Sequence, residues 1–210
     1  MNKWLKLSIQ IVLGVVVVIL AYIVYKQILD PLDFQKQVKN REAAVIDRIK
    51  DIRSAEQAFK QKNQHYTADF DSLINFVLTD SLVFERQLGS ADDSVAVAKG
   101  LVKTEKFTKA VRDTVFAPKK LTTEQIKNIR YIPHAEPGTQ YILNAGLLTT
   151  ESKVVVPVFE AKAPYKAFLY DLNEQMLINL ISDAKNVYYK YPGIAVGSVE
   201  RATNDAGNWE

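Results

Sequence analysis

Residues 7–25 read LSIQIVLGVVVVILAYIVY, and only Ser8 and Gln10 in this run of 19 residues carry polar side chains. A helix rises about 1.5 Å per residue, so the run is long enough to cross the hydrocarbon core of a bilayer. No charged residue lies between Lys6 and Lys26, and aromatic side chains stand near both ends, as is common at membrane interfaces. The sequence therefore predicts a membrane anchor near the start of the chain.

We assign this transmembrane helix to residues 7–28. The alternative is a cleaved signal peptide, but the apolar core of such peptides usually spans about 7 to 15 residues, and no small-x-small cleavage site precedes Lys26. The chain has no cysteine that could carry a lipid, so we expect the helix itself to be the anchor. The absence of cysteine fits an oxidising compartment, but it is equally normal in a protein that needs no disulfide.

The charges alone do not set the orientation of the span, since Lys3 and Lys6 precede it and several basic residues follow it closely. We expect residues 1–6 to be cytoplasmic and the body to lie outside, because long domains cross membranes largely regardless of their charge. This orientation places the protein in the inner membrane of a bacterium with a periplasmic C-terminal domain.

The rest of the chain has the size and charge of one ordinary domain. Roughly 180 residues follow the span, enough to bury a core without disulfides. Lys and Arg number 27 against 24 Asp and Glu, and the two signs are interspersed, so we expect no nucleic-acid partner. We predict a cytoplasmic tail at 1–6, a transmembrane helix at 7–28, an elbow and amphipathic helix at 29–64, an extracytoplasmic α+β domain at 65–201 and a flexible tail at 202–210.

An amphipathic helix is predicted immediately after the span. Pro31 lacks a backbone donor and disfavours a helical residue before it, which predicts an elbow at 29–32. Residues 34–63 contain neither Gly nor Pro. Their apolar side chains form one stripe, interrupted by Glu42 and Glu56, whose members are Val38, Val45, Ile49, Ile52 and Phe59. The stripe must pack on the protein's own sheet or on a partner helix, and the first is the commoner arrangement.

The segment QAFKQKNQHYTADFDSL at residues 57–73 carries a family resemblance. It resembles the part of type IV pilins and type II secretion pseudopilins where the long amino-terminal helix ends in an aromatic-x-polar-polar-x-x-Tyr element before a loop and a second helix. The matching positions here are Phe59, Tyr66, Leu73 and Phe76-Val77. The resemblance covers about residues 1–80 and implies a pilin-like head on a membrane helix.

Two features of that family have no counterpart in this chain. No glycine of a prepilin peptidase site precedes the apolar run, and the first acidic residue is Asp30, so the early helix glutamate of mature pilins is missing. The layout of short tail, span, coiled-coil-prone stretch and small α+β head is also similar to single-span inner-membrane assembly subunits of pilus and secretion machines.

The middle of the chain gives weaker signals. Residues 71–87 predict one or two helices with a break at 79–81, residues 89–93 a loop, and residues 95–102 a short strand, while 103–116 remains unassigned. Asp92-Asp93 lacks the spaced oxygen ligands of a calcium loop, so we interpret it as a solvated turn. Thr122 to Gln125 has the pattern of a capping box before a short helix that ends near residue 128.

The C-terminal third predicts a sheet and one helix. Residues 129–132, 140–148 and 153–160 are rich in β-branched and aromatic side chains and predict a three-stranded antiparallel meander, with Pro157 at an edge or bulge. Residues 173–189 predict a helix, and 194–199 then pair back onto the sheet. The fold class predicted is α+β, with an N-terminal transmembrane helix, an amphipathic helix and an antiparallel sheet with packed helices as a pilin-like head.

The sequence offers little catalytic chemistry. His65 and His134 each stand in predicted loops without further ligands at zinc-site spacing, and no phosphate-binding loop or nucleophile elbow is present. Tyr188, Tyr189 and Tyr191 suit either a recognition surface or a core. We therefore expect no enzyme activity, no catalytic residue, no metal and no cofactor.

The function predicted is that of a non-enzymatic, single-pass structural subunit of a bacterial envelope complex for secretion, translocation or a pilus-like machine. Its partners would be other membrane proteins, with homo-oligomers as an option. The candidate contact residues are Gln10 and Gly14 in the span, the stripe Val38, Val45, Ile49, Ile52 and Phe59, and Trp209 in the tail. The alternative is a membrane-tethered binding module or chaperone that captures secreted clients at the sheet edge near Pro157 or at the Tyr cluster.

Overall fold

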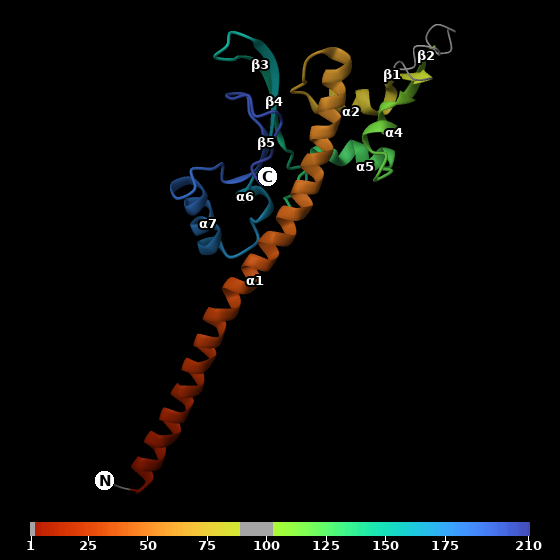
Figure 1. The fold of residues 1–210 in the computed structure, drawn as a ribbon. Coiled ribbons are helices and arrows are strands. Elements are labelled where there is room, and N and C mark those ends of the chain that lie inside the picture. The colour runs from red at the N-terminus through yellow and green to blue at the C-terminus, as the bar shows by residue number, and fades with distance from the viewer. Residues whose placement is uncertain (1–2, 89–102) are drawn as a thin grey trace.

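One very long helix organises the molecule. The computed structural model describes residues 3–88 and 103–210, and its first element is α1 (Lys3–Asn63), a helix of 61 residues (Figure 1). The head packs around the C-terminal half of α1, while the N-terminal half projects away from it. Among the described residues, α1 is the one helix that is long and apolar enough to cross a membrane. Its most apolar stretch contains no buried residue.

The predicted elbow at 29–32 is wrong, because α1 runs through Pro31 without a break. A proline inside a helix removes one hydrogen bond and costs about 3 kcal/mol. Long stretches of helix-forming residues flank it on both sides, and each adds a hydrogen bond once the helix exists. The single loss is therefore outweighed, and the amphipathic segment continues the apolar N-terminal segment as one helix.

The remaining elements lie on two sides of α1 (Figure 1). One side holds α2 (Phe70–Thr79), β1 (Ser81–Leu88), β2 (Lys103–Ala110), α4 (Val111–Val115) and α5 (Thr123–Lys127). The chain then crosses α1 through the 3-10 turn η1 (Asn128–Arg130). The other side holds β3 (Ile142–Thr149), β4 (Val155–Pro164), α6 (Tyr165–Phe168), α7 (Glu174–Asn186) and β5 (Gly193–Gly197). The class is α+β with antiparallel sheets, as predicted.

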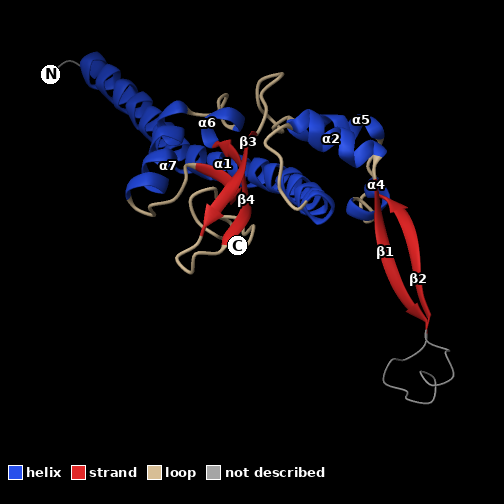
Figure 2. Ribbon diagram, turned by 90° about the horizontal axis from the view of Figure 1, so that it is seen from above, coloured by secondary structure: helices blue, strands red, loops and turns tan. Residues whose placement is uncertain are grey.

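The segment 81–88 is a strand, which corrects the predicted helix at 71–87 beyond α2. β1 pairs antiparallel with β2, a segment that the sequence left unassigned, and the hairpin extends away from α1 (Figure 2). Cross-strand pairs favour the strand over a helix here. Phe84 stacks on Phe107 with ring centroids 5.7 Å apart, and Lys106 forms an ion pair with Glu85 at 3.0 Å. The loop predicted at 89–93 and the strand at 95–102 lie outside the described residues.

The main sheet has the order β3-β4-β5. Two strands of the predicted meander and the return of the last strand are confirmed, but 129–132 forms η1 and a single bridge between Tyr131 and Gln140. The third strand of the sheet is therefore β5. Pro157 pairs with Leu147 of β3, whereas β5 pairs with β4 only from Glu160 onward, so the proline has a strand on one side alone.

The predicted short helices are present. α5 begins with the expected capping box, in which Gln125 N donates to the Thr122 hydroxyl and Thr122 N donates to the Gln125 side chain. α7 begins at the cap Asn173 as predicted, but it ends at Asn186. Tyr188, which lies within the helix predicted at 173–189, is therefore beyond the helix end and is exposed.

The core forms where the C-terminal half of α1 meets both sides of the head. Val45, Ile49 and Ile52 are fully buried, and Val38 marks the first buried position of α1 within the described residues. Their neighbours in the core come from the sheet and the helices, and the large fully buried members include Phe159, Phe168, Leu73 and Ile129. The stripe of α1 thus packs on the protein's own head, the arrangement that the sequence favoured.

The C-terminal segment 202–210 is attached to the head, in contrast to the flexible tail that the sequence predicted. Gly207 forms a bridge with Val196 of β5. The Asn208 side chain donates to Gly193 O at 2.8 Å and accepts from Ala195 N at 3.1 Å. These contacts satisfy backbone hydrogen-bonding groups on the side of β5 that faces away from β4. The segment therefore covers this edge of the sheet.

Candidate functional site

The projecting half of α1 is the largest surface that the head leaves uncovered. Gln10 and Gly14 lie on it and are exposed, and a side-chain carbon added at Gly14 would meet nothing within 4 Å. Ser8 Oγ donates to Trp4 O at 3.0 Å, so this hydroxyl is satisfied within the helix. The side-chain amide of Gln10 has no hydrogen bond to a described residue and is exposed.

The other predicted contact residues lie within the head. Val38, Val45, Ile49 and Ile52 belong to its core and present no surface to a partner. Phe59 is half-buried and packs edge-on against Phe76 with centroids 5.1 Å apart. Trp209 is half-buried against the head, with the guanidinium of Arg53 on α1 5.9 Å from the ring centroid. These residues therefore join α1 to the head.

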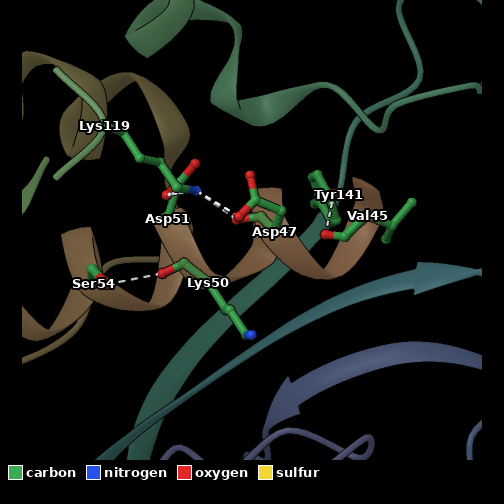
Figure 3. A network of polar contacts seen from close by, with 7 residues as sticks. All are labelled: Val45, Asp47, Lys50, Asp51, Ser54, Lys119 and Tyr141. Atoms are coloured by element: carbon green, nitrogen blue, oxygen red, sulfur yellow. Dashed lines mark hydrogen bonds and ion pairs between the residues drawn. The ribbon is translucent and has the colours of Figure 1, made fainter. Parts of the chain in front are cut away.

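A polar network on α1 fixes one side of the head (Figure 3). Lys119 Nζ lies 2.8 Å from Asp47 Oδ1 and 2.7 Å from Asp51 Oδ1, which are one helical turn apart. Burial raises the pKa of Asp51, and the Lys119 ammonium opposes this shift. Tyr141 donates its buried hydroxyl to Val45 O at 3.1 Å. The segment before β3 and the turn after α4 are thus both tied to α1.

Arginines of α1 hold further parts of the chain. Arg41 forms a two-bonded ion pair with Asp171, between α6 and α7. Arg48 donates to Asn128 O at 2.7 Å, and Arg53 donates to Glu210 Oε1 at 2.7 Å. Planar guanidinium groups suit such paired contacts because several N–H donors point in fixed directions. Contacts from one helix therefore fix the orientation of the head on the rod.

Glu56 is the most unusual ionisable residue of the core. Its side chain is fully buried on α1, Thr67 N donates to Glu56 Oε2 at 3.1 Å, and Glu56 Oε1 has no hydrogen-bond partner among the described residues. Burial raises the pKa of Glu56 to about 8, and the nearby Asp205 carboxylate adds to the shift. The carboxyl group anchors the loop between α1 and α2. The sequence showed Glu56 only as a gap in the apolar stripe.

A groove of about 480 Å³ opens between α1, α7 and the C-terminal segment. Aromatic rings of Tyr165, Tyr188, Tyr191 and Trp209 line it together with polar groups. Tyr165 donates a hydrogen bond to the half-buried Glu42, whose pKa is raised by burial and lowered in part by this bond. The predicted Tyr cluster is thus split, because Tyr189 is 87% exposed and does not line the groove.

The two histidines lie apart in loops. His65 Nδ1 is 2.9 Å from Tyr66 O and its ring meets Phe59 edge-on, while His134 adopts a left-handed backbone conformation with φ of 61°. Within residues 3–88 and 103–210, no group of three His, Asp or Glu side chains could hold a metal ion.

We compared the chain with protein-family models, with curated proteins and with solved structures, and none of the three comparisons finds a match. The function therefore has to be inferred from the chain's own residues and their geometry.

Proposed function

We propose that the protein is a non-enzymatic, single-pass membrane subunit of a bacterial envelope assembly, with its head in the periplasm. The proposal rests on one observation, which is that the two halves of α1 have different surroundings. Its N-terminal half is apolar and unburied, and its C-terminal half forms the centre of the head. A free surface of this kind is stable in lipid but not in water.

The mechanism proposed is placement of a rigid head at a fixed position above the bilayer. Because α1 continues through Pro31, no joint separates the span from the head. Ion pairs from Arg41 and Lys119 prevent the head from rotating on the helix. Any rotation or tilt of the span in the membrane would therefore be passed directly to the head surface that partners contact.

A pilin-like arrangement is the form of the proposal that we favour. A long helix with an apolar first half and an α+β head on its second half supports it, and so does the short loop that joins α1 to α2 at residues 64–69. Residues 7–29 contain no glutamate, which favours an anchored accessory subunit over one that polymerises.

Gln10→Leu tests the role of the span in assembly. The tagged full-length protein is recovered from gently solubilised membranes, and co-purified proteins are identified and counted by mass spectrometry. An interhelical amide bond in a membrane contributes on the order of 1 kcal/mol, so we expect Gln10→Leu to lower partner recovery about threefold or more. Gln35→Leu, on the exposed part of α1 outside the span, is the matched control and should leave recovery unchanged.

The outcomes separate the two classes of function. Stoichiometric recovery of a small set of integral membrane proteins, reduced by Gln10→Leu, supports the assembly subunit. Equal recovery with both variants contradicts a role for Gln10. Recovery of many soluble proteins in place of membrane partners would favour the tethered binding module, for which the groove beside Tyr188 and Trp209 is the specific feature.

A further inference from the structure

The groove between α1, α7 and the C-terminal segment has the size and lining of a small-molecule site. Its volume of about 480 Å³ lies in the usual range for such sites, roughly 300 to 1,000 Å³. Small-molecule sites are mostly apolar with a few polar groups that fix the orientation of the ligand. Here the aromatic rings of Tyr188, Tyr191 and Trp209 accompany the carboxylates of Glu42 and Asp183 and the ammonium of Lys190.

The charges around the groove disfavour a charged ligand. Cations already lie over two of its rings: Arg53 is 5.9 Å from the Trp209 centroid, and Lys162 Nζ is 5.2 Å from the Tyr191 centroid. A cationic ligand would meet these groups and Lys190. An anionic ligand would meet Glu42 and Asp183 instead. The groove therefore carries both signs of charge next to aromatic rings.

A neutral polyhydroxylated ligand fits this combination. Each hydroxyl both donates and accepts a hydrogen bond, so it can donate to the carboxylates and accept from the Lys190 ammonium. The carbon faces of a sugar ring are apolar and can lie against an aromatic ring such as that of Tyr188, which is 66% exposed and open to contact. A ligand with one dominant sign of charge, such as a polycationic peptide or a lipid phosphate, would instead meet like charges on one side of the groove.

We propose that this groove is a binding site for a short neutral oligosaccharide. The inference goes beyond the assembly role, because a subunit of an envelope complex needs no glycan site to be held in place. It does not depend on that role either, since a tethered binding module would use the same groove.

The tryptophan content of the chain provides a direct readout. Trp4 and Trp209 are the two tryptophans, and Trp4→Phe leaves Trp209 in the groove as the single tryptophan, whose emission is excited selectively beyond the tyrosine absorption band. The full-length chain is held in lipid nanodiscs, because maltoside detergents are themselves neutral saccharides. The probes are maltotriose, cellotriose and chitotriose, with trilysine and trigalacturonate as cationic and anionic contrasts. Equilibrium dialysis of the same probes reports binding that does not change the Trp209 emission.

We expect saturable binding of at least one neutral trisaccharide and none of the charged probes. Tyr188→Ala should weaken that binding about fivefold, the usual value of one aromatic contact. Tyr189→Ala is the matched control, because Tyr189 is adjacent and 87% exposed but lies outside the groove, and it should leave the affinity unchanged. Both side chains are exposed, so neither change should unfold the head.

Three results would overturn the proposal. The first is the absence of saturable binding of every neutral trisaccharide by both methods. The second is tighter binding of trilysine or trigalacturonate, which would assign the groove to a charged ligand. The third is an equal loss of affinity in Tyr188→Ala and Tyr189→Ala, which would place the bound sugar outside the groove.

Discussion

Several charged residues of α1 make tertiary contacts that their residue types do not predict. Glu56 interrupts the apolar stripe in the sequence, yet its side chain is fully buried and accepts a hydrogen bond from Thr67 N. Arg41, Arg48 and Arg53 look like a solvated face, yet they fix three separate parts of the head. A periodicity argument assigns charged positions to the solvent side, so it misses charges that have partners far away in the chain.

The buried Glu56 makes the stability of the head depend on pH. Burial raises its pKa from the ordinary 4.5 to about 8, so the folded protein binds the proton more tightly than the unfolded chain. The stabilising effect of this proton is complete below pH 4.5 and is lost as the pH rises toward 8. We expect the free energy of unfolding to fall by on the order of a few kcal/mol over this range from this group.

Glu56→Gln removes the titration and keeps an acceptor for Thr67 N. Chemical unfolding at pH 5, 7 and 9 should show that this variant loses less stability with rising pH than the natural chain. Glu136→Gln changes an exposed carboxylate and serves as the control, with an unchanged slope. Parallel pH profiles for Glu56→Gln and the natural chain would contradict the burial of this carboxyl group.

At the scale of elements, the sequence predicts local structure well where the residues themselves decide it. The apolar run, the stripe at 38–59, the capping box at 122–125 and the helix after Asn173 were all predicted from local pattern, and the structure contains them. The strand β1 was missed because its conformation depends on pairing with β2, a partner that local propensity does not reveal. Tyr131 was likewise assigned to a full strand but forms a single bridge.

The candidate sites were harder to predict than the elements. The sequence singled out Trp209 and the tyrosines. It could not show that Trp209 packs on Arg53, or that Tyr188 lines the groove while Tyr189 does not. The first depends on a contact between residues more than a hundred positions apart, and the second accompanies the left-handed backbone conformation of Tyr189. Gln10 and Gly14 are exposed in the structure, and their contact with neighbouring spans stays a prediction.

The continuity of α1 can be measured directly, since the chain has no cysteine to interfere with site-directed spin labels. Labels at Val17→Cys and Ala43→Cys lie on exposed positions on either side of Pro31. A straight helix separates them by about 39 Å. We expect electron–electron double resonance in nanodiscs to give a single distance near this value, unchanged by Pro31→Ala. A shorter distance that lengthens in Pro31→Ala would restore the elbow.

The second half of α1 should also be the energetic centre of the head. Ile49 is fully buried, so Ile49→Ala should lower the free energy of unfolding by about 2 to 5 kcal/mol, as for other large-to-small core changes. Ile28 is 61% exposed on the same helix, and Ile28→Ala should leave head unfolding unchanged. Equal effects of the two changes, followed by denaturant unfolding, would show that the head does not depend on this face of α1.

At the scale of the whole molecule, the two halves of one helix have different surroundings, because the first is apolar and unburied and the second packs in the head. Among the described residues before Val38 none is fully buried, although Phe34 packs partly buried against the core, and the residues after Val38 form the head. The central claim is therefore that α1 lies in a bilayer over its first half and stands in the periplasm over its second.

Single-cysteine labelling tests this claim most directly. Lys3→Cys, Val17→Cys and Lys36→Cys are expressed separately and exposed to a membrane-impermeant maleimide in spheroplasts, before and after lysis. We expect Lys36→Cys to react in intact spheroplasts, Lys3→Cys to react only after lysis, and Val17→Cys to react only after the membrane is dissolved in denaturant. Reaction of Val17→Cys at the rate of Lys36→Cys would contradict the membrane span, and reaction of Lys3→Cys alone in intact spheroplasts would reverse the orientation.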